Sequence, residues 1–241
     1  MVKLRVNVPI RALTAGVQEV LIAPKITRID NPAIPDLSGS KRYPVNVFIS
    51  NFLTAFGLPN FGRQMVFNYV RRAEDALDEY LMAREQLLRF VNSGADSPIT
   101  PYLSALRHFE QCIAHLDHGF NYAFQLTGEW GYQRGDGSRM SRIDHLHNWI
   151  KHTDGRMGNV ETRHQATLET MSYQKLDHEQ PQEHLIARTS NVPVWLTSDG
   201  LESRDTQIAY HELADEIEEY MEDACKIARM SLKPEDKPPG S

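Results

Sequence analysis

The sequence has 241 residues, of which 41% are hydrophobic and 24% are charged, and its formal net charge is −6 at pH 7. This composition is typical of a soluble globular protein, and no apolar stretch approaches the roughly 18 to 20 residues that cross a bilayer. The acidic total argues against a protein that wraps nucleic acid through its phosphates, and so against non-specific DNA binding.

The number of cysteines and the first ten residues indicate in which cellular compartment we expect the protein. Cys112 and Cys225 are the only cysteines, too few to staple a chain of this size with disulfides. The opening "MVKLRVNVPI" lacks the long apolar core of a signal peptide. We therefore expect a cytoplasmic protein without a membrane partner.

Residues 1–45 form an N-terminal arm in this interpretation. Leu4, Val6 and Val8 alternate with polar residues, which is the period of a half-buried strand, and "VQEVLI" at 17–22 is a second candidate strand. Four prolines between 24 and 44 then oppose a helix. We expect an extended, locally basic arm, which either covers a core or binds a partner.

A long helix is predicted over 60–94, preceded by a short one in the apolar segment 45–57. Its apolar residues recur every seven residues in two positions, a pattern typical of packed helices. They are Val66, Ala73, Tyr80 and Leu87 in one position, and Val70, Leu77 and Val91 in the other.

A second long helix is predicted up to Gly128. Thr100 followed by Pro101 is a start signal, with a capping side chain and then proline at the first helical position. The same seven-residue frame predicts one apolar face made of Tyr102, Phe109, Leu116 and Ala123 in one position, and Leu106, Ile113 and Phe120 in the other. The short connection to the first long helix predicts antiparallel packing.

The stretch "SRIDHLHNWIKHTDGR" at 141–156 predicts a third, shorter helix. Ser141 and Asp144 resemble a capping box, and Gly155 ends the helix. We expect a loop or small hairpin insertion at 154–205, a closing helix at 206–230 with a strongly acidic solvated face, and a disordered tail at 231–241. The fold class is thus mainly all-α: an up-down helical bundle forming a single domain over 1–241, with its first helices at 45–153.

Two carboxylates flank the apolar face of the second long helix. Glu110 and Asp117 lie one heptad apart beside this face, and buried carboxylates need partners. The third helix offers Arg142, His147 and Lys151. Two interpretations stay open: an ion-paired cluster that fixes helix packing, or a site that binds or cleaves a ligand.

Metal and cofactor sites receive less support. His108, Cys112 and His115 share one stripe of the second helix, with His118 one turn further, but we expect this stripe to face away from the core. No second Cys/His pair stands at a convincing distance, and phosphate-loop, dinucleotide-binding, serine-hydrolase and zinc-protease motifs are absent from the sequence. We expect no metal and no cofactor, and we expect the glycine-rich segment 131–139 to be a flexible connector.

The order of these helices, with a polar Arg/Asn/His motif on the third, resembles the HEPN superfamily. "RIDHLH" fits the family spacing of an arginine, four residues and a histidine, with Arg142 and His147 in those positions. Ile143 departs from the polar residue usual after the arginine. A second alignment over "HNWIKH" makes Asn148 the polar residue and His152 the histidine, with His147 replacing the arginine.

The resemblance covers roughly 45–153 and 206–230, and it implies a function. Many members are dimeric, metal-independent endoribonucleases of bacterial stress or defence systems, so it implies a homodimer, RNA as partner, and Arg142, His147, Asn148 and His152 as candidate catalytic residues. Histidine can transfer the protons of RNA cleavage, and arginine can stabilise the phosphate charge. The alternative is a non-catalytic helical interaction or dimerisation module with a protein partner.

Overall fold

The computed structural model describes residues 18–19, 22–42, 45–46, 49, 60–93, 98–152 and 192–230. Over these residues the protein is mainly helical, with one small three-stranded antiparallel sheet. The strand expected at 4–8, the tail at 231–241 and most of the 154–205 insertion lie outside the described residues. None of the described helices combines the length and the apolar character that a membrane crossing requires.

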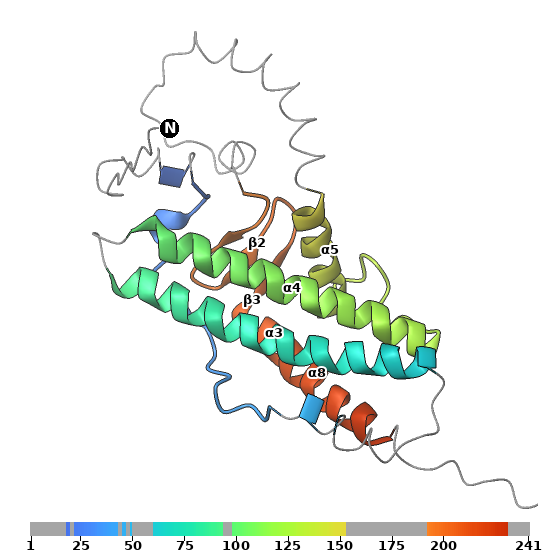
Figure 1. Ribbon diagram of the computed structural model, residues 1–241. Helices are drawn as coiled ribbons and strands as arrows, with labels where there is room; N and C mark the ends of the chain where they lie inside the picture. The colour runs from blue at the N-terminus through green and yellow to red at the C-terminus, as the bar shows by residue number, and fades with distance from the viewer. Residues whose placement is uncertain are drawn as a thin grey trace, which may run out of the picture.

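Two long helices form the centre of the molecule. Helix α3 (Asn60–Asn92) and helix α4 (Ile99–Thr127) run antiparallel and side by side (Figure 1). Most of the predicted core positions are confirmed, whereas Val91 of α3 and Ala123 of α4, near the helix ends, are only partly buried. The buried ones are Val66, Val70, Ala73, Leu77, Tyr80 and Leu87 on α3, and Tyr102, Leu106, Phe109, Ile113, Leu116 and Phe120 on α4. The heptad pattern therefore identified the face along which the two helices pack.

Helix α4 starts differently from the prediction but ends at the predicted glycine. The helix begins at Ile99 after Pro98, and no side chain caps it, so the predicted Thr100 cap is wrong. Proline fixes an extended backbone ahead of the first turn, which starts the helix without a capping side chain. At the other end, Gly128 has φ +77° and donates its N–H to the Phe124 carbonyl at 2.7 Å, a left-handed helix stop.

Helix α8 (Tyr210–Met230) packs across α3, and its Tyr220 ring lies against Gly119 of α4. The Tyr220 hydroxyl donates to the Tyr69 carbonyl at 2.6 Å, and the two rings meet edge to face at 4.8 Å. A Cβ at Gly119 of α4 would overlap the phenol end of Tyr220. Because Gly119 has no side chain, the Tyr220 ring can pack between α3 and α4.

A small sheet precedes α8. Strands β1 (Trp195–Leu196), β2 (Gly200–Glu202) and β3 (Gln207–Ala209) pair antiparallel in the order β1-β2-β3. The antiparallel pair β1–β2 agrees with the hairpin predicted near the end of the insertion. The third strand occupies 207–209, where we expected the first turn of the closing helix. The expected helix start at 206 is therefore wrong, and the helix begins at Tyr210. Ile208 pairs with Leu201, and both are fully buried, so burial favours the strand over an earlier helix start.

The described part of the N-terminal arm, chiefly residues 22–42, packs on the same core. Ala23, Ile26 and Leu37 are buried, and a short 3₁₀ turn, η2 (Ile26–Arg28), interrupts the arm. The strand expected at 17–22 is wrong, because residues 18 and 19 are helical and the Ile22 N–H donates to the Gln18 carbonyl at 3.0 Å. A short apolar run does not distinguish strand from helix by periodicity alone.

Candidate functional site

Helix α5 (Arg139–Lys151) carries the motif, and its first turn is built differently from the expectation. Ser138, not Ser141, is the N-cap, and its side chain accepts the Ser141 N–H at 3.2 Å. Ser141 lies inside the helix, where its hydroxyl accepts the Gly135 N–H at 2.8 Å. The predicted Ser141 capping box is therefore wrong, and the connector before α5 is tied to the helix by hydrogen bonds.

Arginines on α5 fasten this helix to α8. Arg139 contacts three carboxylates of the acidic α8 face, with Asp215 at 3.5 Å, Glu216 at 3.3 Å and Glu219 at 2.6 Å. This face was expected to be solvated, yet Glu216 is only 7% exposed, and burial raises its pKa to about 7. The acidic face is thus partly a docking surface for α5.

Arg142 also points to α8. Its guanidinium forms two hydrogen bonds to the Glu212 carboxylate, at 2.6 and 2.9 Å, and a third to the Gln207 carbonyl at 3.3 Å. The Arg142 hydrogen bond lowers the pKa of Glu212. Arg142 therefore holds α5 against α8 and β3, and it does not join the candidate cluster with His147.

His147 points the other way, to α4. Its Nδ1 lies 2.8 Å from Asp117 Oδ2, and the two side chains are 12% and 8% exposed. Asn121 donates to the same Asp117 oxygen at 3.1 Å. The predicted contact between a carboxylate of the second long helix and a side chain of the third helix is confirmed for Asp117 and His147.

A second imidazole faces His147. The rings of His118 and His147 are 5.6 Å apart and nearly perpendicular. Partial burial lowers the pKa of His118, and the positive charges of Arg72 and Lys151 lower it further, although the nearby Asp117 carboxylate acts in the opposite direction. His118 is therefore neutral near pH 7 and able to accept a proton, and its side chain remains exposed.

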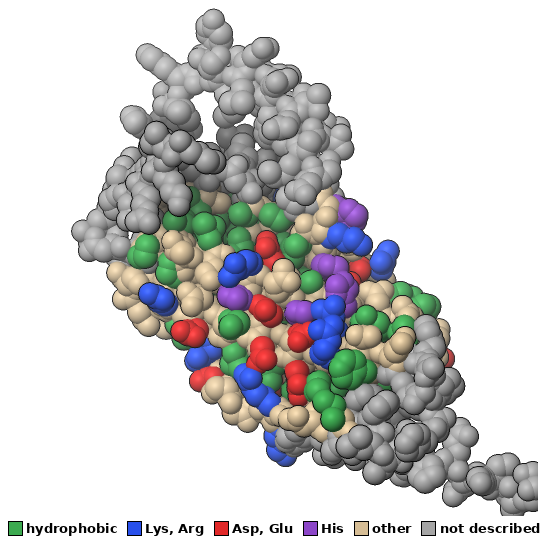
Figure 2. All heavy atoms as spheres, viewed as in Figure 1, with side chains coloured by type: hydrophobic (Ala, Val, Ile, Leu, Met, Phe, Trp, Pro, Cys, Tyr) green, Lys and Arg blue, Asp and Glu red, His purple; other side chains and the backbone are tan. Residues whose placement is uncertain are grey.

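Helix α3 contributes an arginine to the same surface. Arg72 Nη1 lies 2.6 Å from His115 Nδ1, and burial is the main cause that lowers the pKa of His115. Arg72 Nε is buried without a hydrogen-bond partner among the described residues. Figure 2 shows histidine, basic and acidic side chains gathered along the middle of this face. We call Arg72, Asp117, His118 and His147 the histidine cluster.

The stripe considered for a metal faces α3, which corrects the expectation that it faces away from the core. Cys112 is fully buried, and burial raises the pKa of its thiol. His108 Nδ1 lies 2.6 Å from Glu79 Oε2 of α3. No group of three or more potential metal ligands gathers within the part of the chain that the structure describes.

The other candidate residues lie apart from the cluster. Asn148 donates to Asp144 twice, to its carbonyl at 2.9 Å and to its Oδ1 at 3.2 Å. His152 is exposed just beyond the end of α5, and Lys151 is exposed on its last turn. The Lys151 charge still reaches His118, so Lys151 borders the cluster while Asn148 and His152 do not join it.

Glu110 is separate as well. Burial raises the pKa of its carboxyl to about 7, and no hydrogen bond or ion pair to it is found among the described residues. The predicted group of Glu110, Asp117, Arg142, His147 and Lys151 is therefore divided. Only Asp117 and His147 meet directly.

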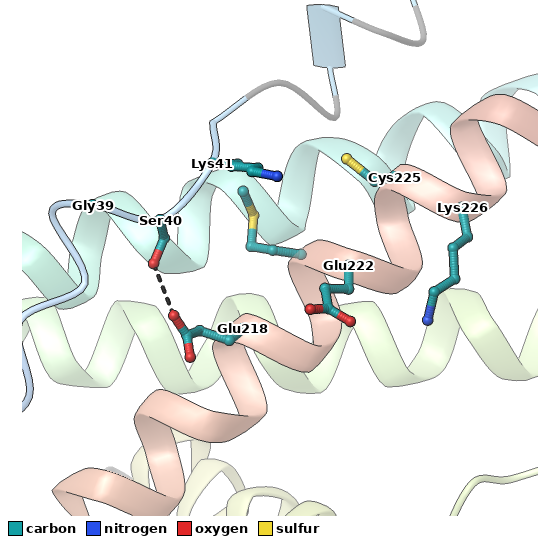
Figure 3. Close-up of a pocket in the computed structure, with 8 residues that line it drawn as sticks. Gly39, Ser40, Lys41, Glu218, Glu222, Cys225 and Lys226 are labelled. Atoms are coloured by element: carbon teal, nitrogen blue, oxygen red, sulfur yellow. Dashed lines mark hydrogen bonds between the residues drawn. The ribbon is translucent and has the colours of Figure 1, made fainter.

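A separate hollow of about 450 Å³ lies beside α8. Figure 3 shows Lys41 approaching from the N-terminal segment and Ser40 donating to Glu218 at 3.1 Å. Its charged lining residues carry both signs, since Lys41 and Lys226 face Glu218 and Glu222. This mixture gives no preference for a ligand of one charge, so the hollow adds no function to the histidine cluster.

Sequence reasoning missed two members of the cluster. His118 was considered only as a fourth residue of the metal stripe, although its position next to Asp117 was a usable signal. Arg72 belongs to a helix that carried no motif, and only the pairing of α3 with α4 brings it to this surface.

The cluster combines two imidazoles, a carboxylate and a guanidinium; His118 is exposed, whereas the His147 and Asp117 side chains are only 12% and 8% exposed. Such groups can transfer protons and stabilise negative charge. Comparison with protein-family models, with curated proteins and with solved structures finds no match to this chain. The functional assignment therefore depends on the geometry of the cluster.

Proposed function

We propose that this protein is a HEPN-like, metal-independent endoribonuclease of a bacterial stress or defence system, which acts at the histidine cluster. One observation carries the proposal. The ring centroids of His118 and His147 lie 5.6 Å apart. The positive charge of Arg72 acts on His118, and the Asp117 carboxylate holds His147. This spacing suits two groups that act on opposite sides of one phosphodiester.

The reaction uses the 2′-hydroxyl of the RNA as nucleophile. Neutral His118 takes the 2′-hydroxyl proton as the oxygen attacks phosphorus, and His147 gives a proton to the 5′-oxygen as the P–O5′ bond breaks. Arg72 stabilises the charge on the phosphoryl oxygens. The products are a 2′,3′-cyclic phosphate and a free 5′-hydroxyl, with no change in oxidation state.

The proposal includes the finer architecture that the resemblance implies. The helices belong to an up-down bundle that forms a cytoplasmic homodimer. Two side chains of the face that carries the cluster are exposed, His118 of the cluster and the neighbouring Lys151. A second copy related by a two-fold axis would close this face into a cleft wide enough for one RNA strand.

The test is cleavage of a mixed-sequence single-stranded RNA by the full chain in excess EDTA. We expect fragments with 2′,3′-cyclic phosphate and 5′-hydroxyl ends. His147→Asn should lower the rate at least about 100-fold, because a positioned acid–base group contributes that much or more.

His152→Asn is the matched control, since His152 is exposed just beyond the end of α5 and lies apart from the cluster. It should leave the rate unchanged. Loss of cleavage in His152→Asn alone would favour the second motif alignment, and cleavage that EDTA abolishes would contradict the mechanism.

A second candidate is a non-catalytic helical interaction or dimerisation module. The contacts of Arg142 favour this second candidate, because the guanidinium of this motif residue is hydrogen-bonded to Glu212 and to the Gln207 carbonyl. A protein without cleavage on any RNA, whose His147→Asn variant loses only stability, would fit this candidate.

A further inference from the structure

An exposed tryptophan beside the histidine cluster is held in one orientation. Trp130 is 43% exposed, and its ring stacks on Phe124 with centroids 4.4 Å apart and an interplanar angle of 13°. Tyr132 meets it edge to face at 5.7 Å. Two aromatic neighbours thus fix the indole, although much of its surface faces solvent.

This tryptophan borders a hollow with aromatic and polar walls. The hollow has a volume of about 630 Å³ and is lined by Trp130, Tyr132, Gln133 and Arg134. The Arg134 side chain is 75% exposed, and the Gln133 side chain is exposed too. A planar group that enters this hollow meets an aromatic surface together with amide and guanidinium donors.

Contacts connect the hollow to α4 and α5, the helices that carry most of the histidine cluster. Arg134 Nε lies 3.3 Å from Asp144 Oδ2, and Asp144 lies three residues before His147 on the same helix. On the other side, the Tyr132 ring lies 6.0 Å from Phe120, which follows Asp117 by one turn of α4. The Asp117 and Asp144 charges both reach the Tyr132 phenol, where burial is the main cause that raises the pKa to about 12.

We propose that the hollow beside Trp130 is a stacking subsite for one unpaired nucleobase of a single-stranded RNA. A base in a duplex is stacked on its neighbours and hidden from side chains, whereas an unpaired base can stack on an aromatic ring. The choice of RNA as ligand rests on the proposed function. The subsite adds its substrate class, a strand with an unpaired base next to the scissile phosphate.

The test is binding of a 2′-O-methylated, fluorescein-labelled single-stranded RNA to the full chain, followed by anisotropy. This RNA has no free 2′-hydroxyl, so it binds without being cleaved. Trp130→Leu should weaken binding about tenfold, and Trp130→Phe, which keeps a ring, should lose less. Leu103→Ala, a change at a similarly exposed apolar residue, should bind like the wild type.

The outcomes separate this inference from the proposed function. Trp130-dependent binding without cleavage of ordinary RNA would support the subsite and contradict the ribonuclease. Cleavage with unchanged binding by Trp130→Leu would contradict the subsite and leave the ribonuclease standing. A Trp130→Leu variant that changes only the sedimentation coefficient would overturn the subsite in favour of a protein interface.

Discussion

Single side chains of α5 take different partners although they lie within one short helix. Arg142 is bound on the α8 side, and His147 is bound on the α4 side. Residues five apart on a helix are separated by about 140° around its axis, so they face different neighbours. The geometry gives Arg142 a structural contact with α8 and leaves His147 as the residue of this motif to which the proposed function assigns chemistry.

Replacement of Arg142 tests this division. Arg142→Lys keeps the charge but loses the paired hydrogen bonds to Glu212, so the free energy of unfolding should fall by about 1 to 2 kcal/mol. Chemical denaturation measures the loss, with Arg107→Lys at an exposed position as control. The rate of RNA cleavage should not change. A large loss of rate at unchanged stability would restore Arg142 to the site.

Glu110 predicts a pH dependence of stability. Its pKa is about 7 in the folded protein against a model-compound value of 4.5. Below pH 4.5 the carboxyl is protonated in both states; between pH 4.5 and 7 only the unfolded chain ionises, so stability falls as pH rises through this window and is constant above it. Glu110→Gln should therefore stabilise the protein by about 3 kcal/mol at pH 8 and by almost nothing at pH 4.

Thermal unfolding at the two pH values measures this difference. Glu85→Gln, at an exposed carboxylate of α3, is the control and should have no effect at either pH. An equal gain from Glu110→Gln at pH 4 and pH 8 would show that ionisation is not the cause.

At the scale of elements, the heptad repeat predicted the two long helices and their buried faces well. It did so because the period of apolar residues reflects packing directly. The N-caps of α4 and α5 were missed by two and three residues, since several Ser, Thr and Pro residues compete as start signals there. Strand β3 has three residues, too short for a periodic signal, and only pairing with β2 reveals it.

The crossing of α4 and α8 predicts a cost for one added methyl group. Gly119→Ala should destabilise the protein by about 1 to 3 kcal/mol, because the Cβ displaces the Tyr220 ring and its hydrogen bond to Tyr69. The better helix propensity of alanine, about 1 kcal/mol, offsets only part of this loss. Urea denaturation measures it. Unchanged stability would mean that Tyr220 moves freely, contrary to its burial.

At the scale of the whole molecule, the candidate site combines three helices. Arg72, His118 and His147 come from α3, α4 and α5, and no local pattern connects them in the sequence. The pair of Asp117 and His147 could be predicted, because both flank apolar faces that must meet. The position of Arg72 could not be predicted, because it depends on the axial register in which α3 packs against α4.

The charge of the molecule predicts a weak dependence of RNA binding on salt. The chain is acidic overall, and Arg72 and Lys151 are the cations at the cluster. Two phosphate contacts give a slope of about −1 to −2 when the logarithm of the binding constant is plotted against that of salt concentration. Anisotropy titrations at several salt concentrations give this slope. A value steeper than about −4 would indicate an extended basic surface elsewhere.

His118→Asn gives the most direct test of the central claim, that the histidine cluster is a catalytic site. His118 is exposed and has a lowered pKa, so its removal should change the free energy of unfolding by less than about 0.5 kcal/mol. The rate of RNA cleavage in EDTA should nevertheless fall at least about 100-fold. Wild-type cleavage by His118→Asn, or a loss of rate that only follows a loss of folding, would contradict the claim.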